Sequence, residues 1–334
     1  MKKIVSLTGI IFFFLLALSP LAFKKRDKEK MNEAIEKSLV LLQKSSHTFL
    51  ENANGCHSCH HQGLGGVSFA LAKEKGYPIQ DSIVQELEDS IEHTWRGNKY
   101  DLTESNDGST VVMTGGYGMW ALAANHVKPD KYMIQLANNI MQKQSDNGSW
   151  VSPNPRPPLE YYAFSATALS VKGIQYFLPA ALQPIVKERL GHAKKWMMQT
   201  TPQTNEERIY QILGLSWCNG DPGFIKKQAA SLLAKQQADG GWSQLESLPT
   251  DAYATGQSLY ALNESGYLNT EDSSYKKGIA YLLNTQREDG SWKVQSRSYA
   301  VVPYVYSGFP HGENQFISAA GSNWATMALL LAVK

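Results

Sequence analysis

Three copies of one short motif constrain the fold of this chain more than any other feature of its sequence. The copies are Gln144–Trp150, Gln236–Trp242 and Gln286–Trp292, and each has the form Gln-x-x-Asp/Asn-Gly-x-Trp. The last two tryptophans are 50 residues apart and the first two are 92 apart, which is about twice that interval. A repeat of roughly 46 residues indicates a fold assembled from similar supersecondary units. We therefore expect a degenerate copy between the first two motifs.

Each motif lies between two helical segments of different character. The segment before it has one polar face, which suits an outer position, and the segment after it is rich in small and apolar residues, which suits an inner one. The pattern predicts outer helices over roughly 31–50, 81–95, 129–144, 184–199, 223–237 and 273–286. It predicts inner helices that begin near Gly65, Gly116, Tyr161, Arg208, Ala252 and Ala319.

Six helix pairs are enough to close a ring of inner helices inside a ring of outer ones. A closed ring leaves no exposed apolar end, whereas an open solenoid needs capping repeats. With 334 residues and a hydrophobic fraction of 43%, the chain can bury a large core. The sequence therefore predicts an all-α protein, an (α/α)6 toroid over residues 31–334.

The repeated motif resembles the QW motif of squalene–hopene cyclases and related prenyltransferase-type repeat proteins. The resemblance covers most of the chain after about residue 30, and it implies an α/α toroid with a central cavity. Those cyclases carry an Asp-x-Asp-Asp acid motif at the start of an inner helix. The nearest match here is Asp251-Ala-Tyr253-Ala, in which two of the three carboxylates are missing. The resemblance thus supports the fold more strongly than squalene cyclisation.

The N-terminus predicts export. Lys2 and Lys3 precede an apolar run, and residues 1–23 have the character of a signal peptide or an uncleaved membrane anchor. Residues 24–30 are expected to form a basic linker. We expect the body of the protein in the periplasm or held at the outer face of the cytoplasmic membrane through this segment. A net charge of +2 gives no basic surface of the kind that nucleic acid requires.

A second motif predicts a cofactor. Cys56-x-x-Cys59-His60 matches the attachment sequence of c-type haem, in which two thiols form thioethers and the histidine is the proximal iron ligand. We therefore expect Cys56, Cys59 and His60 to bind one covalent haem c, with His60 on the iron. The distal ligand is left open between Met113, Met119, His126, His311 and a vacant position.

Three other interpretations of this motif stay open. Cys56, Cys59 and His60 or His61 could contribute to a zinc site, although no second Cys/His pair is present. The two cysteines could form a redox-active dithiol, or the short pattern could occur by chance.

The motif occupies the first of the loops that join outer to inner helices. We expect all of these loops at one end of the toroid, so Glu160, Asp251 and Tyr253 become candidate catalytic residues near the cavity. Asp251 could instead only cap its helix. The leading hypothesis is an exported haem protein active in electron transfer or haem-based redox chemistry, with a redox partner. The alternative is a haem-free cyclase-like enzyme or a toroid that binds a small hydrophobic ligand.

Overall fold

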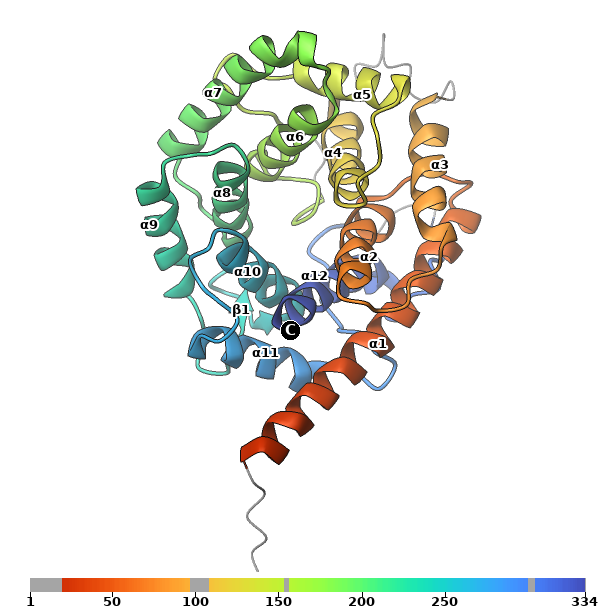
Figure 1. Ribbon diagram of the computed structural model, residues 1–334, viewed down its shortest axis with the longest axis vertical. Coiled ribbons are helices and arrows are strands. Elements are labelled where there is room, and N and C mark those ends of the chain that lie inside the picture. Colours follow the sequence, from red (N-terminus) through yellow and green to blue (C-terminus); the bar gives the residue numbers. More distant parts are fainter. Residues whose placement is uncertain (1–19, 97–107, 153–155, 300–303, 334) are drawn as a thin grey trace, which may run out of the picture.

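The computed structural model describes residues 20–96, 108–152, 156–299 and 304–333, with side chains for residues 28–95, 111–152, 156–299 and 304–333. Within these residues the fold consists of two concentric rings of helices (Figure 1). The inner helices are α2 (Leu64–Glu74), α4 (Gly108–Ala124), α6 (Ala163–Phe177), α8 (Asn205–Trp217), α10 (Ala252–Glu264) and α12 (Gln315–Ala332). The outer helices are α1 (Pro20–Asn52), α3 (Ser82–Arg96), α5 (Lys131–Gln142), α7 (Gln183–Gln199), α9 (Pro222–Leu233) and α11 (Ser273–Thr285).

Each inner helix contacts the next around the ring, and α12 returns to contact α2, which closes it. Short elements complete the described chain: the π-helical turn η1 (Cys59–Gly63), the 3₁₀ turns η2 (Ala180–Leu182) and η3 (Gly312–Asn314), and an antiparallel pair, β1 (Trp242–Ser243) with β2 (Thr250–Asp251). The core lies between and inside the two rings, where Tyr117, Tyr210 and Tyr253 are fully buried. The predicted toroid is confirmed.

Helix boundaries differ from the expected ones for local reasons. α8 begins at Asn205 rather than near Arg208, because Thr204 and Glu207 form a reciprocal capping box. α1 begins at Pro20, so residues 24–30, which were expected to form a linker, are helical. The first nineteen residues of the predicted signal or anchor lie outside the described residues. Among the helices that the structure describes, none is both long and apolar enough to cross a membrane.

The glutamine of each repeated motif joins one repeat to the next. Gln144, Gln236 and Gln286 each donate from Nε2 to the carbonyl of the glycine in their own loop, at 2.9, 2.9 and 3.1 Å. The same amide also reaches a backbone carbonyl of the following outer helix: Arg189 at 2.9 Å, Ser274 at 2.8 Å and Ala34 at 2.8 Å. Because Ala34 lies in α1, the third motif connects the last repeat to the first.

The tryptophan of each motif completes the end of the preceding outer helix. The indole N–H groups of Trp150, Trp242 and Trp292 donate to carbonyls ten residues earlier, at 2.6, 2.9 and 2.8 Å. These carbonyls belong to the last turns of α5, α9 and α11, and each accepts the indole N–H in addition to a backbone N–H from the end of its own helix. All three indole rings are buried. The tryptophans therefore have a structural role: they hold the loops against the ends of the outer helices.

The ring closure depends on a glycine, and its replacement should destabilise the protein. Gly290 has φ +85°, and a Cβ there would lie 2.6 Å from the backbone carbon of Lys37 in α1. Gly266 also has a left-handed backbone, with φ +69°, but a Cβ on Gly266 would have no atom within 4 Å. Gly266→Ala should cost only the left-handed backbone strain, about 1–2 kcal/mol. Gly290→Ala should cost more, by roughly 1–3 kcal/mol, because α1 must also move. Urea unfolding of both variants measures the difference; equal losses would contradict this account of closure.

Candidate functional site

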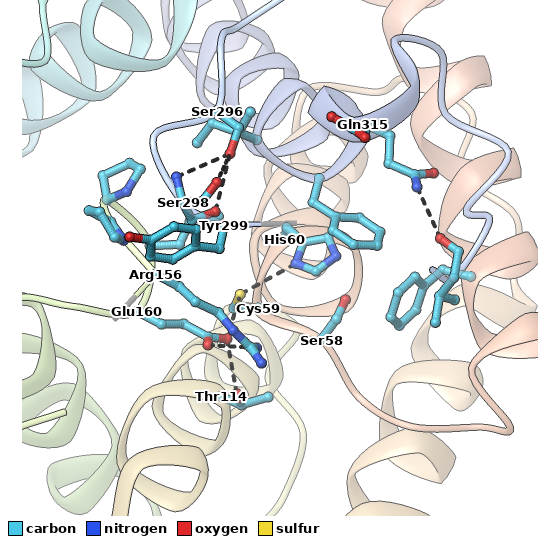
Figure 2. Close-up of a pocket in the computed structure, with 18 of the residues that line it drawn as sticks. Ser58, Cys59, His60, Thr114, Arg156, Glu160, Ser296, Ser298, Tyr299 and Gln315 are labelled. Carbon is cyan, nitrogen blue, oxygen red and sulfur yellow. Dashed lines mark hydrogen bonds and ion pairs between the residues drawn. The ribbon is translucent and has the colours of Figure 1, made fainter. Parts of the chain in front are cut away.

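A cavity of about 420 Å³ opens among the loops at one end of the toroid. Its apolar wall includes Phe49 of α1, Leu159, and Phe316 and Ile317 of α12. Its polar wall includes Cys56, Cys59 and His60 from the loop before α2, with Arg156 and Glu160 from the loop before α6. Both these loops precede inner helices, so the expectation that they meet at one end is confirmed. The site therefore combines an apolar face with a compact polar cluster (Figure 2).

The turn that carries Cys59 and His60 is held rigidly. Ser58 caps η1 by accepting from the His61 backbone N–H at 3.2 Å, and its hydroxyl donates to Gln62 Oε1 at 2.7 Å. Gln62 Nε2 donates in turn to the Ser46 carbonyl of α1 at 2.9 Å. On the other side, the His57 backbone N–H donates to Thr94 Oγ1 of α3 at 2.8 Å. The turn is thus fixed to two outer helices.

Cys59 connects the polar groups of the cavity. Its thiol donates to Glu160 Oε1 at 3.3 Å, and its sulfur lies 3.4 Å from His60 Nδ1. Glu160 also pairs with Arg156, whose guanidinium is 3.2 Å from Oε2. Thr114 of α4 donates to Glu160 Oε1 at 3.5 Å. Figure 2 shows Cys59 between His60 and the Glu160–Arg156 pair. Burial, reinforced by the Glu160 charge, raises the pKa of the Cys59 thiol well above its usual value, so the sulfur stays protonated.

Three histidines in this segment are neutral. Burial lowers the pKa of His57 and of His60 to about 3, with smaller contributions from His60 and from Arg156 respectively. Burial also drives the pKa of His61 well below its usual value. The His60 ring lies 4.5 Å from the ring of Phe316 and 5.4 Å from that of Phe49, measured between centroids. The His60 and His61 rings belong to an aromatic cluster with Phe49 and Phe316, and all three imidazoles are uncharged at neutral pH.

A second polar cluster lies inside the ring of inner helices, and none of its members lines the cavity. Tyr253 of α10 donates to Glu206 Oε1 of α8 at 3.0 Å, and burial raises the pKa of Glu206 to about 8. The hydroxyls of Tyr117 and Tyr210 are 2.8 Å apart. Burial also raises the pKa of Asp251 to about 6. Its carboxylate accepts from the Ala254 backbone N–H at 2.8 Å, as an N-cap.

The structure separates the three candidate catalytic residues. Glu160 lies at the cavity with Cys59, whereas Asp251 and Tyr253 belong to the inner cluster and are absent from the cavity lining. Asp251 also accepts from Gln244 Nε2 at 2.8 Å, and Gln244 in turn accepts from Arg297. Any catalytic role of these residues stays a prediction.

The sequence analysis overlooked Arg156 and Glu206. Arg156 lies in a loop with no repeat pattern, and an acidic residue in the first turn of a helix is ordinary, so neither carried a recognisable signal.

Comparison with known proteins places the fold among the terpene cyclases. The chain is 23% identical over 318 residues to lanosterol synthase from Candida albicans, which covers 91% of this chain and 36% of that protein. It is 29% identical over 115 residues to squalene–hopene cyclase from Bradyrhizobium diazoefficiens, covering 31% of this chain and 17% of that one. The chain therefore spans about a third or less of the length of these relatives. No family model matches it.

Solved structures agree with these relatives. An arginine-to-alanine variant of the type II terpene cyclase MstE from Scytonema, in complex with its substrate geranylgeranyl dihydroxybenzoate, matches with a TM-score of 0.58. The match covers 92% of this chain and 99% of that one, at 15% identity. An aspartate-to-alanine variant in complex with the product merosterolic acid A gives the same values. The chain has the terpene cyclase toroid fold.

These findings overturn the leading functional hypothesis. The expectation of a haem protein for electron transfer or redox chemistry, built on Cys56, Cys59 and His60, is wrong, because both the relatives and the structural neighbours are cyclases. The thiol of Cys59 instead has an internal partner in Glu160. The alternative hypothesis, a haem-free toroid of the cyclase type, agrees with the comparisons.

The comparisons do not test the remaining expectations about cofactor and cellular compartment. No group of three or more His, Cys, Asp or Glu side chains in the described part of the chain is arranged to hold a metal ion. The zinc alternative, the periplasmic location and the redox partner gain no support from the comparisons.

The buried Glu206 should make stability depend on pH. Its pKa is raised from 4.5 to about 8, so the folded protein holds a proton that the unfolded chain releases between these values. Stability is therefore full below pH 4.5 and falls as pH rises through 8, by at most about 1.4 kcal/mol per pH unit. Glu206→Gln keeps an acceptor for Tyr253 and should flatten the decline between pH 6.5 and 8.5 in urea titrations. Glu188→Gln, exposed on α7, is the control; an unchanged slope in Glu206→Gln would contradict the assignment.

Proposed function

We propose that this protein binds a prenyl-type apolar ligand in the cavity at the loop end of the toroid. The observation that carries the proposal is the cavity itself, with an aromatic and aliphatic wall facing a small set of fixed polar groups. Ligand sites for small molecules have this composition: mostly apolar lining, and a few placed polar atoms that orient the ligand. The structural neighbour MstE binds geranylgeranyl dihydroxybenzoate, a prenylated molecule, on the same fold.

The apolar wall of the cavity is built mainly from the two ends of the described sequence. Phe49 and Phe316 belong to the first and last helices, and their ring centroids are 6.0 Å apart in an edge-to-face contact. Contacts of this type are rigid and present hydrocarbon surface to the cavity at little entropic cost. An extended prenyl chain would lie against this wall and against Ile317, leaving its other end near Cys59 and Glu160.

A ligand-binding role has better support than acid-catalysed cyclisation of the ligand. Protonating an alkene requires a strong, well-placed acid. At the position of the cyclase acid motif only Asp251 remains, and it is engaged as an N-cap and by Gln244. Glu206 has a pKa of about 8, which makes it a weak acid, and it accepts from Tyr253. Neither carboxyl group lines the cavity.

Replacing Phe316 by alanine should weaken ligand binding. Removing a phenyl ring from the apolar wall deletes contacts worth about 1–2 kcal/mol, so the Kd of geranylgeraniol should rise about tenfold. Displacement of an environment-sensitive fluorescent probe measures this, with circular dichroism to verify folding. Tyr176→Ala is the matched control, because Tyr176 is 39% exposed on α6 and absent from the cavity lining. Failure of the wild-type protein to bind the probe or the alcohol would overturn the proposal.

Product analysis of the same mixtures should show unchanged ligand. Gas chromatography with mass spectrometry after prolonged incubation distinguishes binding from turnover. A cyclised product that disappears in Asp251→Asn, which retains the N-cap, would instead establish the enzymatic alternative with Asp251 as the acid.

A further inference from the structure

The hydrogen-bond directions around Cys59 determine the protonation of His60. Glu160 pairs with Arg156, so its carboxylate is ionised and can only accept hydrogen bonds. The Cys59 thiol donates its single proton to Glu160 Oε1. The sulfur can therefore offer only lone pairs to His60 Nδ1, 3.4 Å away. Nδ1 must carry the ring proton and donate it to sulfur. The chain of donors runs from His60 through Cys59 to Glu160, each step fixed by the next.

This tautomer leaves His60 Nε2 as a bare acceptor. Burial keeps the imidazole neutral, so Nε2 carries a lone pair and no proton. Nε2 is buried, and it has no hydrogen-bond partner among the described residues. His60 lines the cavity between the aromatic wall and the Cys59–Glu160 pair. A buried acceptor without a donor costs about 1–3 kcal/mol, which a bound ligand can recover.

We propose that the ligand is a prenyl chain ending in a hydroxyl group, and that this hydroxyl donates a hydrogen bond to His60 Nε2. The inference rests on the proposed binding function and names its ligand class. A carboxylate or a dianionic phosphate ester has no proton to donate and would meet both the His60 lone pair and the Glu160 carboxylate, while Arg156 is already paired with Glu160. An ether or a hydrocarbon leaves Nε2 unsatisfied. The cavity should therefore select an alcohol or a phenol over these.

A pair of ligands tests the inference on the wild-type protein. Geranylgeraniol and its methyl ether share the prenyl chain and differ in the hydroxyl proton. We expect the alcohol to bind about tenfold more tightly, the effect of one buried hydrogen bond. Nitrogen-15 spectra of histidine-labelled protein should show His60 protonated at Nδ1, with the Nε2 signal shifting on addition of the alcohol and not of the ether. A proton on Nε2 in the free protein would overturn the inference.

Two variants separate a direct role of His60 from a packing effect. His60→Phe removes the acceptor and suits a position between Phe49 and Phe316, so the ratio of the two Kd values should fall from about ten to about one. His61→Phe is the matched control: His61 is a neighbouring imidazole that is more deeply buried and absent from the cavity lining, so the ratio should persist.

The outcomes distinguish the two proposals. If neither ligand binds the wild-type protein, the proposed function fails. If both bind with equal affinity, or if His60→Phe keeps the preference, binding stands and the hydroxyl inference is overturned. Loss of the preference in His61→Phe as well would also overturn it, because the effect would then come from packing.

Discussion

The bridging amide of the motif glutamine is the contact on which this structure depends. An inner helix can bury its apolar surface only if the helices beside it are held at a fixed distance, and the loops between outer and inner helices would otherwise be free to open. Each glutamine amide donates to a carbonyl of its own loop and to a carbonyl of the next outer helix. Buried backbone carbonyls need hydrogen-bond donors. Because one glutamine amide donates to carbonyls of two successive repeats, it joins them. Gln286 makes the link that matters most, because its partner Ala34 is 252 residues away.

Closure of the ring brings the polar side chains of the cavity together at the loop end of the toroid. Loops that precede the inner helices converge there, and they bring Cys59 and Glu160 together although 101 residues separate them. The toroid interior, by contrast, is filled with tyrosines and with Glu206, which burial keeps protonated. Under the proposed function, ligand recognition depends on the end cavity and on a fixed set of hydrogen-bond directions. The acid motif that provides a strong acid in the cyclases is incomplete in this chain.

The electron-transfer and redox hypothesis built on Cys56, Cys59 and His60 failed for an instructive physical reason. Cys-x-x-Cys-His specifies which atoms are present but not what else they contact. In the folded chain the Cys59 thiol has an acidic partner from a distant loop, and the His60 ring belongs to an aromatic cluster formed by α1 and α12. None of these partners lies near the motif in sequence. A local pattern of five residues cannot encode contacts made by helices at both ends of the chain.

The sequence by itself determined the architecture: the number of helix pairs and the inner or outer place of each. It could do so because helical periodicity and the repeated motif are local signals that recur in every unit. Only the tertiary structure decided where Glu160, Asp251 and Tyr253 lie relative to one another, and that Arg156 and Glu206 matter. Protonation states and hydrogen-bond directions follow from burial and from neighbours across the ring, and these exist only once the ring has closed.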